Sequence, residues 1–128
     1  MPDMDFGFFG VNAGVLADPA TMVEAATTAE AAGWESIWTG EHVVVTSPQR
    51  PPSPVRPDTH FVDQVAALAH LSAHTTTLRL GTGIVILPQR NPVVLAKELA
   101  SIDVLSGGRL EAGFGVGYVP GEFDAVGV

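Results

Sequence analysis

Glu41 and His42 are the adjacent residues with the clearest potential for chemistry. They follow, after Gly40, the short segment 35–39 (ESIWT), which we predict as a strand. Parallel α/β folds place their chemistry at the carboxyl ends of their strands. An imidazole there moves protons near neutral pH, and a neighbouring carboxylate can orient it. We therefore predict His42 and Glu41 as catalytic residues, the alternative being an ordinary polar start to a loop.

Two predicted strands, 78–87 and 110–117, carry glycine at alternate positions. The residues on the glycine side are Arg79, Gly81 and Gly83 in one strand and Glu111, Gly113, Gly115 and Gly117 in the other. Alternation places Leu78, Leu80, Thr82 and Ile84 on the opposite, apolar face. A face cleared in this way suits a planar ligand, or else a barrel interior narrowed for packing or a bend. If the two strands pair so that their glycines lie side by side, Arg79 and Glu111 face each other, which predicts an ion pair at the amino-terminal end of the sheet.

Three further motifs have weaker functional readings. The turn 115–121 (GVGYVPG) imitates a dinucleotide fingerprint, but it follows the last strand and contains Pro120, so we expect at most an anion-binding turn. His70 and His74 share a helix face, and we interpret them as helix-end residues and predict no metal site. The proline-rich segment 46–58 is expected to form a wall or lid over the site, the alternative being a docking segment for a partner.

These residues are positioned by a predicted β-α-β-α-β-α-β order with a further helix begun near residue 122. Asp18-Pro19 and Asn91-Pro92 are cap-plus-proline signals for helices that end near Gly33 and Gly107. We expect Thr59 to cap the helix between them, with Phe61, Val65, Leu68 and Ser72 on its buried face. Strands alternating with helices predict a parallel sheet covered by helices.

Composition narrows the classes of function. The chain has 128 residues, 46% of them hydrophobic, and a formal net charge of −8, which argues against nucleic acid as a partner. It has no cysteine and no apolar run long enough for a membrane helix. Asp3 and Asp5 stand where a signal peptide would carry basic residues, so we expect a first strand there and a cytoplasmic location.

The sequence resembles a known family over nearly its whole length. Residues 81–123 (GTGIVILPQRNPVVLAKELASIDVLSGGRLEAGFGVGYVPGEF) and 29–42 (AEAAGWESIWTGEH) are similar to the luciferase-like monooxygenases, which are flavin- and F420-dependent oxidoreductases. The resemblance implies a TIM-barrel (β/α)8 fold, of which residues 1–128 would supply the first four βα units as one N-terminal half-barrel domain, with parallel strands in the order 1-2-3-4.

The resemblance also implies site residues. Glu41 and His42 match the residues that line the pocket beside the cofactor ring, and Gly83-Ile84 matches a bulge, often with a non-prolyl cis peptide, that braces the ring. Gly115, Gly117 and Tyr118 match the strand end that approaches the cofactor side chain, although many F420 users carry a glutamate near Tyr118. The implied cofactor is FMN or coenzyme F420, which the sequence does not separate, and the implied substrate is a small organic molecule.

Two alternatives stay open. Four strands would leave two open edges, which favours a homo-oligomer or pairing with a complementary half-barrel, and the chain alone would then be catalytically incomplete. A flavodoxin-like open sheet that binds a small ligand is the second alternative, and the strand order distinguishes it.

Overall fold

Four parallel strands form one sheet in the computed structural model, which describes residues 4–128. The elements in chain order are β1 (Gly7–Phe9), η1 (Gly14–Ala17), α1 (Pro19–Ala31), β2 (Ser36–Thr39), α2 (Gln64–Ser72), β3 (Arg79–Ile86), η2 (Leu87–Gln89), α3 (Pro92–Ser106), β4 (Leu110–Gly115) and α4 (Pro120–Val126). Asp3, part of the argument against a signal peptide, lies outside the described residues. No helix within residues 4–128 has the length and apolar character that crossing a membrane requires.

The strand order is β1-β2-β3-β4, with every neighbouring pair parallel. Phe8 pairs with Ile37, Ile37 with Leu80 and Leu80 with Leu110, so the rows run straight across the sheet. This confirms the sequential order expected of a barrel. It contradicts the flavodoxin-like alternative, in which the chain must cross over so that strand 1 lies between strands 2 and 3.

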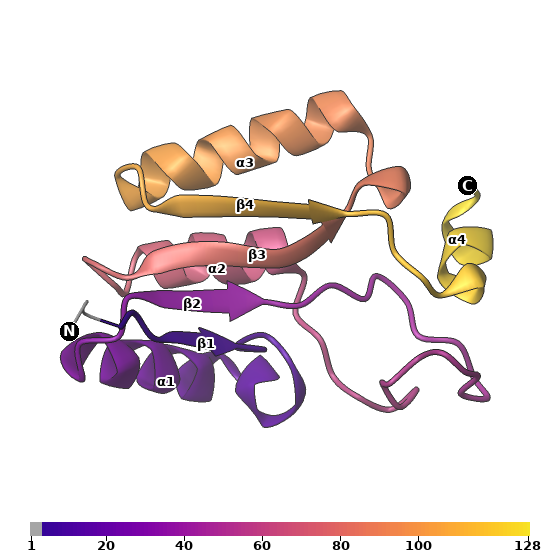
Figure 1. Ribbon diagram of the computed structural model, residues 1–128, viewed down its shortest axis with the longest axis horizontal. Coiled ribbons are helices and arrows are strands. Elements are labelled where there is room, and N and C mark those ends of the chain that lie inside the picture. The colour runs from indigo at the N-terminus through magenta and orange to yellow at the C-terminus, as the bar shows by residue number, and fades with distance from the viewer. Residues whose placement is uncertain (1–3) are drawn as a thin grey trace.

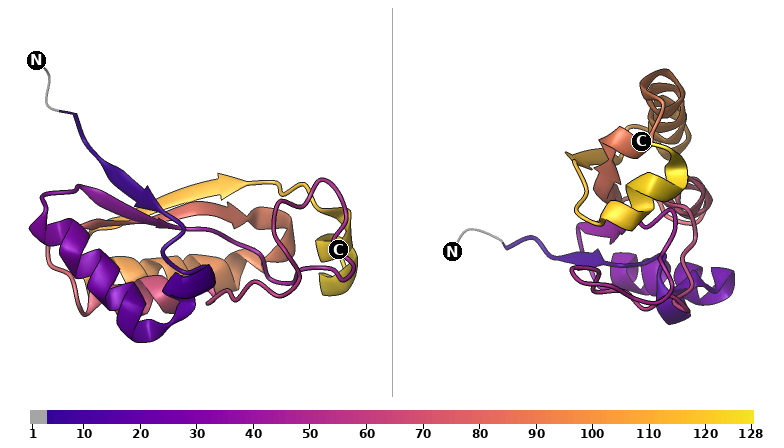
Figure 2. Two further views of the ribbon diagram at one scale, coloured as in Figure 1. Left: turned by 90° about the horizontal axis from the view of Figure 1, so that it is seen from below. Right: turned by 90° about the vertical axis from the view of Figure 1, so that its right-hand side faces the viewer.

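The helices α1, α2 and α3 cover one face of the sheet, and the other face carries no helix (Figures 1 and 2). The core lies between these two layers and contains the fully buried Ile37, Leu68, Leu71, Leu78 and Leu80. All four strand arrows in Figure 1 point toward the same end, where α4 and the irregular segment 40–63 lie. The fold thus gathers the carboxyl ends of the strands beneath one set of connections.

Two of the three predicted helix starts are confirmed, and the third is wrong. Asp18 caps α1 through the Thr21 amide, and Asn91 caps α3 through the amides of Val93 and Val94. Asp63, not Thr59, caps α2 by accepting hydrogen bonds from Val65 and Ala66.

As a consequence of the later start of α2, Phe61 is not on a helix. It precedes α2 and forms an isolated antiparallel bridge with Ala13. The apolar spacing had placed it on the buried helix face, but a capping carboxylate at Asp63 satisfies the helix amides better than a hydroxyl four residues earlier.

The face of the sheet that glycine clears is occupied by the chain's own aromatic rings. A Cβ atom on Gly81 would overlap the indole of Trp38, and one on Gly83 would lie 2.9 Å from Cε2 of Phe9. At these two positions the observed packing matches a barrel interior narrowed to admit large side chains. The face is therefore half filled before any ligand is considered.

Four charged side chains at the amino-terminal ends of the strands have partners within the fold: Glu30, Arg79, Arg109 and Glu111. Arg79 and Glu111 form the predicted ion pair, about half exposed. Arg109 donates to the carbonyls of Ser72, Thr75, Leu78 and Ser106 and to the Thr75 hydroxyl.

Glu30 closes the same edge from the end of α1. Its Oε1 accepts from the amides of Thr76, Thr77 and Leu78 and from the Thr77 hydroxyl. Burial acts to raise the pKa of Glu30, but these hydrogen bonds to the ionised form prevail and lower it to about 2.

Candidate functional site

A cavity of about 480 Å³ opens at the carboxyl ends of the strands. Its walls are mainly apolar, and they come from β1, the segment 40–63, β3 and the residues after β4. The lining residues used below are His42, Phe61, Gly83, Ile84, Gly117 and Tyr118. The volume lies within the range of sites that hold small molecules and cofactors, which are concave and largely apolar.

One wall of the cavity is a bulge in β3. The register between β3 and β4 shifts between Thr82 and Val85, and the Gly83-Ile84 peptide is cis, as the resemblance implied. Strict alternation had placed Ile84 on the helix-covered face. The extra residue of the bulge instead turns this side chain to the glycine-cleared face, where it is 36% exposed and lines the cavity.

The ladder beside the bulge is repaired by a side chain. The Thr82 hydroxyl donates to the carbonyl of Gly113 at 2.9 Å and accepts from the amide of Gly113 at 2.8 Å. A Cβ atom on Gly113 would collide with the Thr82 carbonyl oxygen, so glycine is needed there for strand approach. The bulge is thus a fixed part of the sheet.

His42 stands in the cavity wall with a carboxylate partner that the sequence did not reveal. Its Nδ1 lies 2.5 Å from Oε1 of Glu122 on α4, and the two side chains are 11% and 2% exposed. The ring of Phe61 lies edge-on to the imidazole, with ring centroids 5.4 Å apart. We had expected Glu41 to orient His42, so the structure corrects the identity of the orienting carboxylate.

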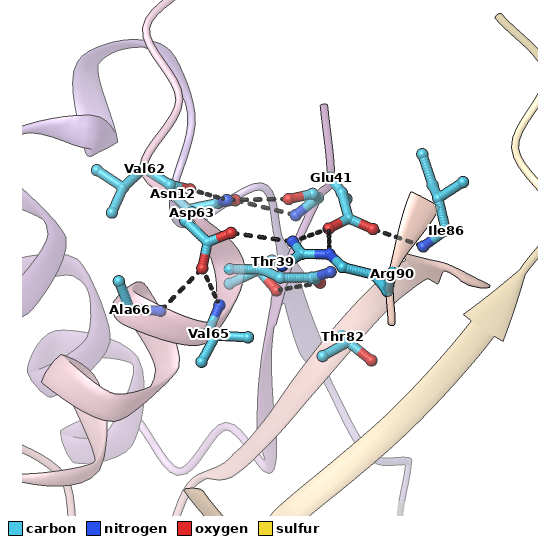
Figure 3. A network of polar contacts seen from close by, with 12 residues as sticks. Asn12, Thr39, Glu41, Val62, Asp63, Val65, Ala66, Thr82, Ile86 and Arg90 are labelled. Carbon is cyan, nitrogen blue, oxygen red and sulfur yellow. Dashed lines mark hydrogen bonds and ion pairs between the residues drawn. The ribbon is translucent and has the colours of Figure 1, made fainter. Parts of the chain in front are cut away.

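Glu41 is buried in a network with Ile86, Arg90 and Asp63 and makes no hydrogen bond to His42 within the described residues (Figure 3). Its Oε2 accepts from the Ile86 amide at 2.5 Å, and its Oε1 accepts from Nε and Nη2 of Arg90. Arg90 also donates to Asp63 at 2.9 Å. Burial opposes the guanidinium charge, but the hydrogen bonds from Arg90 to both carboxylates raise its pKa above the ordinary value.

Both oxygens of Glu41 are therefore engaged in holding the end of β3. Because the network ties the residue after β2 to Ile86 and to the cap of α2, it fixes the frame on which His42 is mounted. Both carboxylate oxygens of Glu41 thus have partners within the fold, and its catalytic role stays a prediction.

The buried Asn12 fastens the same frame from β1. Its Nδ2 donates to the carbonyls of Gly40 and Val62, and its Oδ1 accepts from the Gly40 amide at 2.9 Å (Figure 3). One side chain therefore joins the end of β1 to both ends of the segment that carries His42.

Two glycines, Gly117 and Gly121, allow α4 to pack closely against neighbouring segments. Gly117 has a φ of +75°, and a Cβ atom on it would lie 2.7 Å from Cγ2 of Ile86 and 2.8 Å from Cζ of Phe123. A Cβ atom on Gly121 would lie 2.5 Å from Cγ2 of Thr46. The turn 115–121 therefore lets the helix that carries Glu122 pack onto β3 and the proline-rich segment.

The predicted site residues come together only in part. His42, Gly83, Ile84, Gly117 and Tyr118 line the cavity together with Glu41. Gly115 is absent from that lining, because Ile84 lies over it and a Cβ atom on Gly115 would overlap Cδ1 of Ile84.

Segments outside the sheet behave as two of the weaker motifs predicted. The proline-rich segment contributes Pro54 and Val55 to the cavity, which matches the expected wall. His74 contacts the His70 carbonyl through Nδ1 at 2.9 Å, the helix-end arrangement expected of this pair.

Sequence reasoning missed Glu122, Arg90 and Phe61. Glu122 and Arg90 each lie a few residues beyond a predicted strand end, β4 and β3 respectively. Because the carboxyl ends of parallel strands meet at one edge, their positions were a usable signal. Phe61 gave no such signal, since its spacing fitted the buried face of a helix.

Comparisons with known proteins agree with this architecture. The model of the luciferase-like monooxygenase family matches residues 4–128. The oxygenase component of a flavin-dependent trigonelline monooxygenase from Acinetobacter baylyi is 33% identical over 103 residues, which are 80% of this chain and 26% of that protein.

Two solved structures share the fold. The oxygenating constituent of 3,6-diketocamphane monooxygenase from Pseudomonas putida, in complex with FMN, has a TM-score of 0.75 at 18% identity and covers 98% of this chain and 33% of its own. The F420-dependent tetrahydromethanopterin reductase from Methanopyrus kandleri has a TM-score of 0.69 at 23% identity, with coverages of 98% and 30%. The chain thus spans about a quarter of the curated relatives that it matches and about a third of these solved chains.

Proposed function

The chain belongs to the luciferase-like monooxygenase family, and we propose that it forms the cofactor-facing half of an oxidoreductase that uses reduced FMN or coenzyme F420 on a small organic substrate. The observation that carries the proposal is the cavity of about 480 Å³, in which His42 and the Gly83-Ile84 bulge share one apolar space. The A. baylyi relative is described as flavin-dependent. Of the two similar solved structures, one is a complex with FMN and the other is an F420-dependent enzyme.

The cavity suits the ring of such a cofactor better than its phosphate. Ile84, Phe61 and Val55 offer apolar contacts, and Gly83 and Gly117 bring backbone close to the space. None of the described residues that line the cavity is lysine or arginine. We therefore assign ring binding to this chain and phosphate binding to residues beyond it.

In this proposal the chain's own residues bind, orient and handle one proton. Ile84 and Phe61 contact the reactive region and exclude water, and His42 exchanges a proton with the substrate or cofactor through the ring nitrogen that Glu122 leaves free. When bound, the cofactor supplies the electron pair, either to molecular oxygen in a flavin enzyme or as hydride in an F420 enzyme.

A titration of the purified chain with FMN and with F420, followed by fluorescence, tests the binding step. Ile84→Trp should fill the cavity and weaken binding at least about 10-fold, because it removes the space that the ring needs. Val104→Trp adds the same side chain at a position on α3 that is 80% exposed and should leave binding unchanged. Binding to neither cofactor at high micromolar concentration, or equal binding by both variants, would contradict the proposal.

A second candidate function is a scaffold that becomes competent only when paired. Within residues 4–128, β1 pairs only with β2 and β4 only with β3, so two strand edges are open. Next to these edges Phe9 is 64% and Val116 74% exposed. Since open edges are normally covered or paired, we propose a homo-oligomer or a complementary half-barrel as partner. A monodisperse monomer by light scattering, whose edge-strand amides exchange rapidly with solvent, would refute self-association.

A further inference from the structure

We infer that Glu122 is a positioning residue that fixes the tautomer of His42, so that Nε2 is the proton acceptor facing the cavity. The inference rests on the proposed function for its purpose, because only a reaction that moves a proton requires it. The structural argument stands on Glu122, His42 and the packing of α4.

The first step is the contact itself. The 2.5 Å separation of Nδ1 and Oε1 joins two side chains from segments 80 residues apart, of which Glu122 is buried and His42 only slightly exposed. Where the carboxylate of Glu122 is ionised it only accepts hydrogen bonds, so the proton shared in this contact is carried and donated by Nδ1 of His42. In the neutral imidazole the other nitrogen, Nε2, is then unprotonated and basic.

The second step is the direction of the free nitrogen. His42 lines the cavity, and no residue in the described range 4–128 makes a hydrogen bond to its Nε2. Phe61 packs edge-on against the ring and limits its rotation. With one nitrogen held by Glu122 and the ring held by Phe61, Nε2 remains available to a molecule in the cavity.

The third step is the dependence on α4. Glu122 belongs to a helix that is placed by the close approach of Gly121 to Thr46 and of Gly117 to Ile86 and Phe123. The orientation of His42 on one side of the cavity is therefore set by a helix that follows the last strand. Packing of α4 is what makes His42 a base of defined direction.

The tautomer can be read directly by NMR in the absence of any cofactor. The chain is labelled with 15N-histidine, and the signals of His42 are assigned from the spectrum of His42→Asn. At a pH of about 8.5, well above the ordinary histidine range, the ring nitrogens report which of them carries the proton. We expect the Nδ1–H form to predominate about 10-fold or more, since a charge-assisted hydrogen bond selects it.

Glu122→Gln and Glu122→Met should both reduce that ratio at least about 5-fold, because an amide can also donate and a thioether is a weak acceptor. Asp124→Asn removes the same charge from an exposed position of the same helix and should leave the ratio unchanged. Gly121→Val keeps both groups but displaces α4, and it should lower the ratio as the Glu122 variants do. Circular dichroism verifies that each variant is folded.

An unchanged tautomer ratio in folded Glu122→Gln or Glu122→Met would overturn the inference. An unchanged ratio in Gly121→Val would overturn the role given to α4 packing. Because the readout needs no cofactor, it is separate from the titration with FMN and F420. Failure of cofactor binding would contradict the proposed function while leaving the measured tautomer intact.

Discussion

The charged residues at the amino-terminal ends of the strands and those at the carboxyl-terminal ends have opposite roles. At the amino-terminal edge, Glu30 and Arg109 bond mainly to backbone groups of neighbouring turns, and all their partners belong to the fold. At the carboxyl edge, Glu41 and Arg90 form a comparable network, but His42 beside them keeps one ring nitrogen directed to a cavity. At the amino-terminal ends of the strands these charged groups therefore have only structural partners. At the carboxyl ends one polar atom, Nε2 of His42, remains available to a ligand.

Burial and ion pairing alone therefore do not identify a catalytic residue. Glu41 is buried and lines the cavity, yet all its hydrogen bonds go to partners within the fold, as those of Arg109 do. The distinguishing property of His42 is a polar atom left without a partner among the described residues.

The largest effect is expected from Arg109→Met. The variant loses five hydrogen bonds and leaves carbonyls of Ser72 and Thr75 without their donor. We expect the free energy of unfolding to fall by about 3 kcal/mol, with unchanged affinity for FMN or F420 in the fraction that is folded. Urea denaturation measures the first quantity. Arg56→Met, which alters an exposed pair with Asp58, is the control and should change stability by less than about 0.5 kcal/mol.

Glu41→Gln should affect both stability and binding. Arg90 keeps Asp63 but loses its buried partner, so we expect a loss of about 2 kcal/mol and weaker binding of the cofactor as the frame of His42 loosens. The same substitution at the other edge, Glu111→Gln, should leave cofactor affinity unaltered. If both variants bind equally well, the frame role of Glu41 is wrong.

Glu30→Gln tests the amino-terminal edge through its pH dependence. The pKa of Glu30 is about 2 in the folded chain against an ordinary 4.5, so its stabilising contribution is complete above pH 4.5 and is lost as the pH falls from 4.5 toward 2. Near neutral pH the variant should be less stable by about 1 kcal/mol, after discounting for solvent screening. Denaturation curves of the two proteins should converge as the pH is lowered through this window. Parallel curves would contradict the assignment.

The smallest effect is expected from Arg79→Gln. The ion pair with Glu111 is about half exposed, so its loss should change stability by less than about 0.5 kcal/mol and less still at high salt. A large, salt-independent loss measured by urea denaturation would show that this pair is more than a surface contact.

Local signals in the sequence predicted most of the fold. Asp18-Pro19 and Asn91-Pro92 specify helix starts through the chain's own neighbouring amides. The alternation in β3 and β4 correctly paired the charges of Arg79 and Glu111, although Glu111 lies opposite Gly81 in the register and not opposite Arg79. The exception is α2, where both Thr59 and Asp63 are capping residues and the spacing of Phe61 suited either choice. In the structure the Asp63 carboxylate caps the helix, while Phe61 packs against His42 and forms a bridge to Ala13.

The site was less predictable because its defining contacts are long-range. His42 could be found from its place after a strand, but its partner Glu122 is 80 residues away and depends on how α4 packs. Alternation likewise failed at Ile84, because one inserted residue reverses which face a side chain takes. The resemblance to the family supplied that bulge, which periodicity had hidden.

The buried amide of Asn12 has a consequence for how this chain can change. It holds Gly40 and Val62, so the residues between them form a loop whose two ends are clamped at one point. Once the ends are fixed, lengthening the loop adds little to the entropic cost of closing it, since that cost grows only slowly with length. The proline-rich wall can therefore be rewritten or lengthened, and the shape offered to a substrate altered, without disturbing the sheet beneath it.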